Sequence, residues 1–170
     1  MSPKPPKPND LARVGISRLT SESWQRFRSI RLAALAESSG SFASAVDQEQ
    51  AFTEEQWRAF LLRGATFEAS VQGEAVGLVA GIERVPPGLG SLWVEPSWRG
   101  SGLADRLVDA VAQWASLCGH DRLTLWAITD DLRACRFYER QGFRPTGKTK
   151  AFPGSQSRIV QEMVRALHGP

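Results

Sequence analysis

Residues 92–107 read LWVEPSWRGSGLADRL, which predicts a short β-strand, a turn opened by Pro96, a glycine-containing loop and, immediately after it, an amphipathic helix. The first turn of a helix leaves several backbone N–H groups without partners, and the helix dipole adds positive charge at the same place. Arg99 and Arg106 stand at the two ends of the loop. The stretch therefore predicts an anion site of the kind that binds a phosphate ester.

Hydrophobic periodicity on both sides of this stretch predicts alternating strands and helices. We expect strands at 14–19, 67–71, 75–82, 92–94, 123–128, 143–150 and 158–166, and helices at about 20–37, 53–62, 103–118 and 131–141. Small polar residues after Ser38 predict a loop up to the capping box at 53–56. This order predicts an α+β fold in which helices flank a central mixed sheet that is mostly antiparallel.

The composition indicates one folded unit. The chain has 170 residues, of which 42% are hydrophobic, so it can bury a core of single-domain size. Residues 1–10 (MSPKPPKPND) hold four prolines and two lysines and predict an extended, mobile tail. We therefore expect a single domain over residues 11–170.

Charge, cysteines and hydropathy restrict the partners. The net charge is +3, which permits an anionic ligand without requiring nucleic acid, so we expect no nucleic-acid partner. Cys118, Cys135 and the two histidines lack the spacing of a metal site, so no metal and no disulfide are expected. Because no apolar run approaches the ~20 residues of a membrane span and no signal peptide is apparent, we expect a cytoplasmic protein that binds no membrane.

Three phosphate-binding patterns place glycines before a helix. A P-loop needs Lys followed by Ser or Thr, and Leu103-Ala104 stand there instead, so this pattern is excluded. The dinucleotide fingerprint needs a third glycine where the chain has Asp105, although Asp130 could imitate its ribose-binding acid, so it stays open as a minor alternative. The third candidate ligand is the pyrophosphate of coenzyme A.

Two motifs favour coenzyme A. Residues 94–104 read VEPSWRGSGLA and match the pattern Val-x-Pro-x-x-Arg-Gly-x-Gly-Leu-Gly/Ala. Residues 131–143 read DLRACRFYERQGF and are similar to Asn-x-x-Ala-x-x-Phe-Tyr-x-x-x-Gly-Phe, with Asp131 in place of the asparagine. Both patterns belong to the GNAT superfamily of N-acetyltransferases, and the chain beyond Asp10 resembles this family over nearly its whole length.

The resemblance implies a GNAT-like acyltransferase fold and a site for acetyl-coenzyme A. The backbone of residues 100–105 would cradle the pyrophosphate, and the backbone of residues 92–94 would bind pantetheine and polarise the thioester carbonyl. Whether Asp131 keeps the contact that the family's asparagine makes with pantetheine stays open. The implied cofactor-binding residues are Leu92, Trp93, Val94, Arg99, Gly100, Ser101, Gly102, Leu103, Ala104, Asp105, Asp131 and Tyr138.

The resemblance also implies catalytic roles. Tyr138, the sole tyrosine of the chain, stands where the family keeps the general acid, and a phenol keeps its proton at neutral pH. Its alternative role is to pack the helix on the sheet. Glu83 and Glu95, and also Asp130, are candidates for the general base, with a water chain as the alternative. Cys135 is expected to be a structural helix residue.

The expected function is N-acetyltransfer from acetyl-coenzyme A directly to a primary amine in a ternary complex. The acceptor could be a small molecule, a peptide N-terminus or a lysine. The alternative is a non-catalytic acyl-coenzyme A sensor, and the intact Tyr138 favours the enzyme. Similar proteins often form dimers, which leaves a homodimer open.

Overall fold

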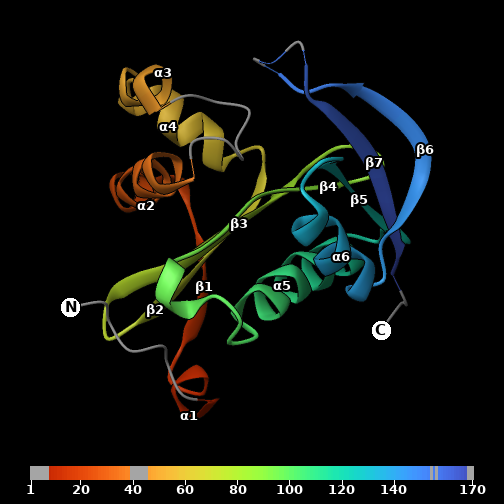
Figure 1. The fold of residues 1–170 in the computed structure, drawn as a ribbon. Coiled ribbons are helices and arrows are strands. Elements are labelled where there is room, and N and C mark those ends of the chain that lie inside the picture. The colour runs from red at the N-terminus through yellow and green to blue at the C-terminus, as the bar shows by residue number, and fades with distance from the viewer. Residues whose placement is uncertain (1–7, 39–45, 154, 156, 168–170) are drawn as a thin grey trace.

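A seven-stranded mixed sheet forms the centre of the molecule (Figure 1), with the strand order β1-β2-β3-β4-β5-β7-β6. The computed structural model describes residues 8–38, 46–153, 155 and 157–167. All neighbouring strands are antiparallel except β4 and β5, which are parallel. The strands are β1 Gly15–Leu19, β2 Gly64–Val71, β3 Glu74–Ile82, β4 Gly88–Val94, β5 Arg122–Ile128, β6 Arg144–Ala151 and β7 Ile159–Ala166. The predicted α+β fold is confirmed.

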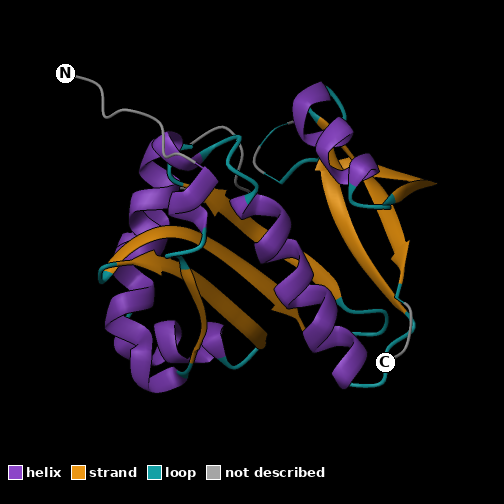
Figure 2. Ribbon diagram, turned by 90° about the horizontal axis from the view of Figure 1, so that it is seen from below, coloured by secondary structure: helices purple, strands orange, loops and turns teal. Residues whose placement is uncertain are grey.

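Helices cover both faces of the sheet (Figures 1 and 2), with α2, α3 and α4 on one side and α5 and α6 on the other. The α-helices are α1 Pro8–Leu11, α2 Trp24–Glu37, α3 Val46–Gln50, α4 Glu54–Leu61, α5 Leu103–Leu117 and α6 Leu132–Arg140. Short 3₁₀ turns lie at η1 Ser21–Ser23 and η2 Pro96–Trp98. In the described part of the chain, no helix has the length and apolar character that crossing a bilayer requires.

The core has two parts because the central strands are buried on both faces. On β3, Leu78 packs in the cluster with α2 and α4, whereas its neighbour Val79 packs in the cluster with α5. Successive side chains of a strand point to opposite faces, so both positions must be apolar. This arrangement explains why residues 75–82 read as a continuous apolar run.

A buried ion pair holds α3 in place, in a region that the sequence predicted as loop. Both oxygens of the Glu49 carboxylate accept hydrogen bonds from Arg31 of α2, at 2.8 and 2.7 Å, and the two side chains are 1% and 6% exposed. Arg31 also donates to the Ser91 hydroxyl of β4 at 3.0 Å. The helix therefore depends on a contact between distant residues, and its own five residues carry no helical pattern.

Other boundaries differ by a few residues. The predicted tail ran to Asp10, but residues 8–10 belong to α1, and residues 1–7 lie outside the described part. Strands β2 and β4 begin three and four residues earlier than predicted, at Gly64 and Gly88. Both added segments contain glycine and small residues, which weaken the alternation on which the prediction rested.

Strands β4 and β5 separate soon after they meet. In the described chain their parallel pairing involves the single residue pair Gly88 and Thr124. On the other side of β4, the register with β3 shifts between Leu78 and Ala80, and Ser91 in this bulge has φ 55°. The backbone of β4 beyond the bulge is therefore turned toward an open seam in the sheet.

Candidate active site

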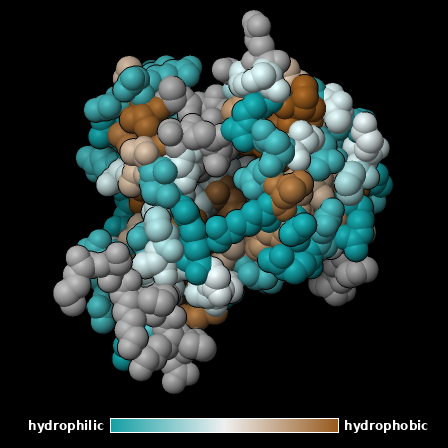
Figure 3. Space-filling view, in the orientation of Figure 1, coloured by the Kyte–Doolittle hydropathy of each residue, from teal (hydrophilic) through white to brown (hydrophobic). Residues whose placement is uncertain are grey.

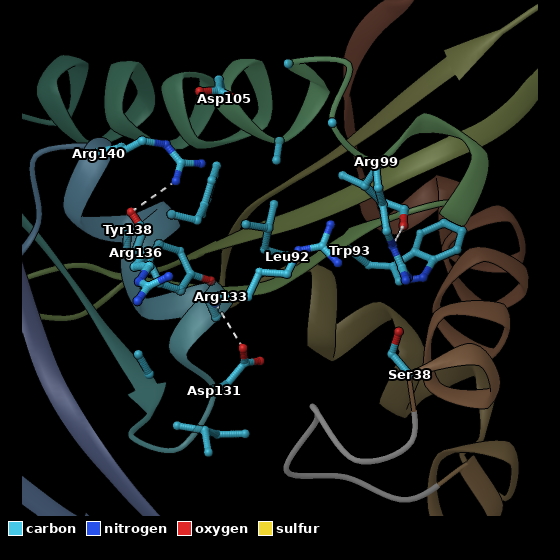
Figure 4. A pocket seen from close by; sticks show the side chains of 18 of the residues that line it. Ser38, Leu92, Trp93, Arg99, Asp105, Asp131, Arg133, Arg136, Tyr138 and Arg140 are labelled. Carbon is cyan, nitrogen blue, oxygen red and sulfur yellow. Dashed lines mark hydrogen bonds between the residues drawn. The ribbon is translucent and has the colours of Figure 1, made fainter. Parts of the chain in front are cut away.

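A cavity of about 790 Å³ lies where β4 and β5 separate, and α6 and the loop after β4 complete its wall (Figure 4). The space-filling view shows this face hollowed near its centre, with a hydrophobic residue at the bottom and hydrophilic residues around it (Figure 3). Ser101 and Leu103 lie outside the lining. The predicted cofactor residues that line the cavity are Leu92, Trp93, Val94, Arg99, Gly100, Gly102, Ala104, Asp105, Asp131 and Tyr138.

The loop before α5 has the backbone shape that its glycines allow. Gly100 and Gly102 have φ angles of 80° and 92°, in the left-handed region that other residues avoid. Gly102 is the N-cap of α5, and Ala104 and Asp105 of the first turn line the cavity. Because first-turn N–H groups have no helical partners, this end of the cavity offers donors and a positive dipole to an anion.

The two arginines of the loop are bound to the protein itself. Arg99 donates from Nε to the Val94 carbonyl at 3.0 Å and from Nη2 to Glu37 at 2.5 Å. Arg106 donates to the carbonyls of Leu11 and Val14 at 2.8 and 3.0 Å and does not line the cavity. Arg106 therefore has a structural role, which ties the N-terminal segment to α5.

Glu37, the last residue of α2, joins this helix to the cavity wall. Its carboxylate accepts hydrogen bonds from the Trp93 indole at 3.0 Å, from Arg99 and from the Ser38 hydroxyl. Burial alone would raise the pKa of Glu37, but these hydrogen bonds, with the charge of Arg99, hold it below its usual range. Sequence reasoning missed Glu37, because nothing local marks a contact with a residue 62 positions away.

Tyr138 projects from α6 and lines the cavity. Its ring packs edge-on against Phe137 and Phe143, with centroid distances of 5.3 and 5.9 Å. Burial raises the pKa of Tyr138 above its ordinary value, and the charges of Asp131 and Cys135 act in the same direction. The phenol is therefore protonated at neutral pH and can donate into the cavity.

Asp131 and Cys135 make hydrogen bonds that hold the N-terminal half of α6 in place. Asp131 is the N-cap, and one of its oxygens accepts from the Ala134 N–H at 3.0 Å while the side chain also lines the cavity. Cys135 is buried, and its thiol donates to the Ile128 carbonyl at 3.4 Å. The aspartate thus keeps the capping function that an asparagine would have there.

None of the three predicted candidates for a general base lines the cavity. Glu83 follows the far end of β3, with Oε1 3.6 Å from His120 Nε2. Glu95 caps η2 by accepting from the Ser97 N–H at 3.0 Å and from the Ser97 hydroxyl. Asp130 pairs with Arg158 at 3.1 Å. Among the described residues, the carboxylates that line the cavity are those of Asp105 and Asp131.

Several further cavity residues do not occupy a fixed position of either motif. Trp126 of β5 lines the wall opposite β4, and Arg133, Arg136 and Arg140 lie at helical spacing along α6. Asp105, which faces this helix, accepts from Gln141 Nε2 at 2.6 Å. In the part of the chain that the structure describes, no three His, Cys, Asp or Glu side chains gather closely enough to hold a metal ion.

Fold, loop and sequence together define the class of protein. Residues 24–143 match the Acetyltransferase (GNAT) family, and the chain belongs to this family of acyltransferases. No curated protein sequence gave a match.

Solved structures share the fold at low sequence identity. The acetyltransferase of the GNAT family from Streptococcus pneumoniae is 18% identical, with a TM-score of 0.73, and the match covers 91% of this chain and 99% of that one. The ribosomal-protein-S18-alanine N-acetyltransferase from Escherichia coli is 15% identical, with a TM-score of 0.68 and coverage of 92% and 96%. The Salmonella typhimurium protein yncA, solved with its cofactor acetyl-CoA, is 14% identical, with a TM-score of 0.70 and coverage of 92% and 95%.

Proposed function

We propose that the chain transfers the acetyl group of acetyl-coenzyme A directly to a primary amine within a ternary complex. The observation that carries the proposal is the cavity at the β4–β5 seam, which has an anion-binding loop at one end and the sole tyrosine of the chain in its wall. A structure of the same fold holds acetyl-CoA as its cofactor, which supports the choice of co-substrate. The acceptor is a small-molecule amine, a peptide N-terminus or a lysine.

We place acetyl-coenzyme A in the seam between β4 and β5. The pyrophosphate lies against the N–H groups of residues 100–105, where the helix dipole of α5 adds to the attraction. The pantetheine arm runs along the backbone of residues 92–94, whose β5 side is open because the strands have separated. Arg99 orients this backbone through its hydrogen bond to the Val94 carbonyl, and Glu37 holds the arginine in that position.

The reaction needs one proton donor and a nucleophile held next to the thioester. The amine nitrogen attacks the carbonyl carbon, an N–C bond forms and the C–S bond breaks. Tyr138 protonates the departing thiolate, and a backbone N–H of β4 stabilises the charge on the carbonyl oxygen. Holding both reactants side by side supplies much of the rate enhancement.

Removal of the proton from the acceptor ammonium is assigned to water. Glu83, Glu95 and Asp130 do not line the cavity, and the Glu37 carboxylate is occupied by three donors. Of the lining carboxylates, Asp105 is bound by Gln141 and Asp131 caps α6. A water chain through the open mouth of the cavity leaves all these interactions intact.

The test is to mix the protein with acetyl-coenzyme A and a panel of amines and to follow the release of free thiol. Turnover with at least one amine is the expected result. Binding of acetyl-coenzyme A without turnover on any amine would contradict the proposal and would instead favour an acyl-coenzyme A sensor. We also propose that residues 11–170 form a single domain, because the sheet takes its strands from residues 15 to 166.

A further inference from the structure

Lys150 of β6 holds its ammonium group over a tryptophan of the cavity wall. The distance from Lys150 Nζ to the centroid of the Trp126 ring is 3.9 Å, within the range of a cation–π interaction. Trp126 lines the same cavity as Tyr138 and the loop before α5. The lysine therefore places a primary amine against a residue that lines the cavity of the proposed acetyl transfer.

The amine lies on the face of the sheet from which an acceptor would approach. On β5, Leu125 and Ala127 pack in the core with α5, so the alternation of the strand turns Trp126 to the opposite face. The anion-binding loop leads into α5, which places the phosphates of the co-substrate on the α5 side. A nucleophile that meets the thioester through the seam must then come from the Trp126 side, where the Lys150 ammonium is held.

The chain has few other amines. Four of its 21 basic side chains are lysines, at positions 4, 7, 148 and 150, and the rest are arginines, whose guanidinium groups stay protonated. Lys148 lies two residues before Lys150 on the same strand, is 73% exposed and has Nζ 3.4 Å from Glu162. Both lysines are exposed, and Lys148 is paired with Glu162 where Lys150 lies over Trp126, so Lys148 serves as the control.

We infer that the chain acetylates its own Lys150 in cis. This inference rests on the proposed acetyl transfer. The Lys150 nitrogen attacks the thioester carbonyl, its new N–C bond replaces the C–S bond, and coenzyme A leaves as the free thiol. The ammonium loses two protons, one to the sulfur through Tyr138 and one to solvent, and no oxidation or reduction takes place. Acetylation removes the charge of Lys150 and with it the cation–π interaction that covers the Trp126 ring.

The experiment uses the full chain with acetyl-coenzyme A and no added amine, and it maps acetyl groups onto each lysine by peptide mass spectrometry over time. We expect Lys150 to gain one acetyl group, at a rate per molecule that does not change on dilution, while Lys148 is labelled much more slowly. Tyr138→Phe should lower the rate at Lys150 by about 100-fold. Lys148→Arg should keep the label at Lys150, and Lys150→Arg should abolish it while retaining a cation over Trp126.

Three results would overturn the inference: equal labelling of Lys148 and Lys150, labelling of Lys150 that Tyr138→Phe leaves unchanged, and a rate that falls on dilution. Thiol release with added amines is measured in parallel. Turnover of an added amine while Lys150 stays unlabelled overturns this inference alone. Absence of both turnover and label overturns the proposed function as well.

Discussion

At the scale of single residues, the protonation of Tyr138 follows from where α6 places it. The ring is buried and packs edge-on against the apolar rings of Phe137 and Phe143, so the phenolate would be poorly solvated. The carboxylate of Asp131 penalises the phenolate further. A group held in its neutral form up to high pH is suited to donate a proton and unsuited to accept one.

Tyr138→Phe should lower kcat by about 100-fold, because a positioned proton donor commonly contributes that much. The ring and its contacts with Phe137 and Phe143 are kept, so the affinity for acetyl-coenzyme A and the melting temperature should change little. Steady-state kinetics, binding by calorimetry and thermal unfolding check the three quantities. An unchanged kcat would remove the acid role from this residue.

In the pH dependence of kcat, the decline on the basic side should begin only at high pH. Because burial raises its pKa above about 10, the ordinary value for a phenol, Tyr138 keeps the proton that it must donate over the whole range up to that pH. On the acid side, activity should rise with pH as the acceptor amine loses its proton to water. The profile is measured with an amine of low pKa, and Glu83→Gln and Glu95→Gln should leave it unchanged. A basic limb near neutrality, or an acid limb lost in either variant, would contradict the mechanism.

At the scale of elements, Arg31 and Glu49 connect α2 and α3 to the bulge in β4. The carboxylate of Glu49 and the hydroxyl of Ser91 together occupy the Arg31 guanidinium. Ser91 begins the part of β4 that turns toward the seam. The ion pair therefore fixes the strand against which we place the pantetheine arm.

Glu49→Gln should destabilise the fold by about 3–5 kcal/mol, because the buried Arg31 guanidinium then loses the negative charge of Glu49. The same substitution in an exposed pair, Glu54→Gln beside Arg58, should change the free energy of unfolding by no more than about 0.5 kcal/mol. Urea unfolding measures both. Equal effects of the two substitutions would mean that the buried pair contributes no more than a surface one.

Gly102→Asp should weaken acetyl-coenzyme A binding because it places a negative charge at the N-terminus of α5, against the pyrophosphate. Gly119, at the other end of the same helix, has a similar φ of 84° and serves as the control. Both substitutions force a side chain into the left-handed region, at about 1–2 kcal/mol. Only Gly102→Asp should raise the dissociation constant for acetyl-coenzyme A, measured by calorimetry. Equal affinities of the two variants would contradict the proposal that residues 100–105 bind the pyrophosphate.

At the scale of the whole molecule, a ligand that binds only the folded state should stabilise it. Acetyl-coenzyme A at 100 times its dissociation constant adds about 2.7 kcal/mol, which raises the melting temperature of a domain of this size by roughly 5–10 °C. NAD at the same concentration should give no shift, and a shift with NAD would restore the dinucleotide alternative. Differential scanning fluorimetry measures both ligands.

The sequence predicted the parts of the molecule that depend on neighbouring residues. The capping box of Thr53 and Gln56 located α4, and two continuous motifs located the loop of residues 100–105 and Tyr138. What it missed depends on contacts between distant residues. Helix α3 is held by a pair 18 positions apart, and Glu37 reaches Arg99 across 62 positions. Trp126 reads from sequence as one apolar residue of a strand, and the separation of β4 from β5 makes it part of the cavity.

The open seam also bears on how strand edges of this sheet can pair with other chains. Exposed strand edges are templates for pairing with another chain, and the seam gives this sheet an unpaired edge in its interior. This edge lies in the middle of the sheet, because β4 pairs with β3 and β5 pairs with β7 on their other sides, and the cavity there leaves room for a narrow chain that lies along β4. An unpaired strand edge promotes aggregation at the rim of a sheet. In this fold the unpaired edge lies at the centre of the sheet, where a narrow ligand can lie along it.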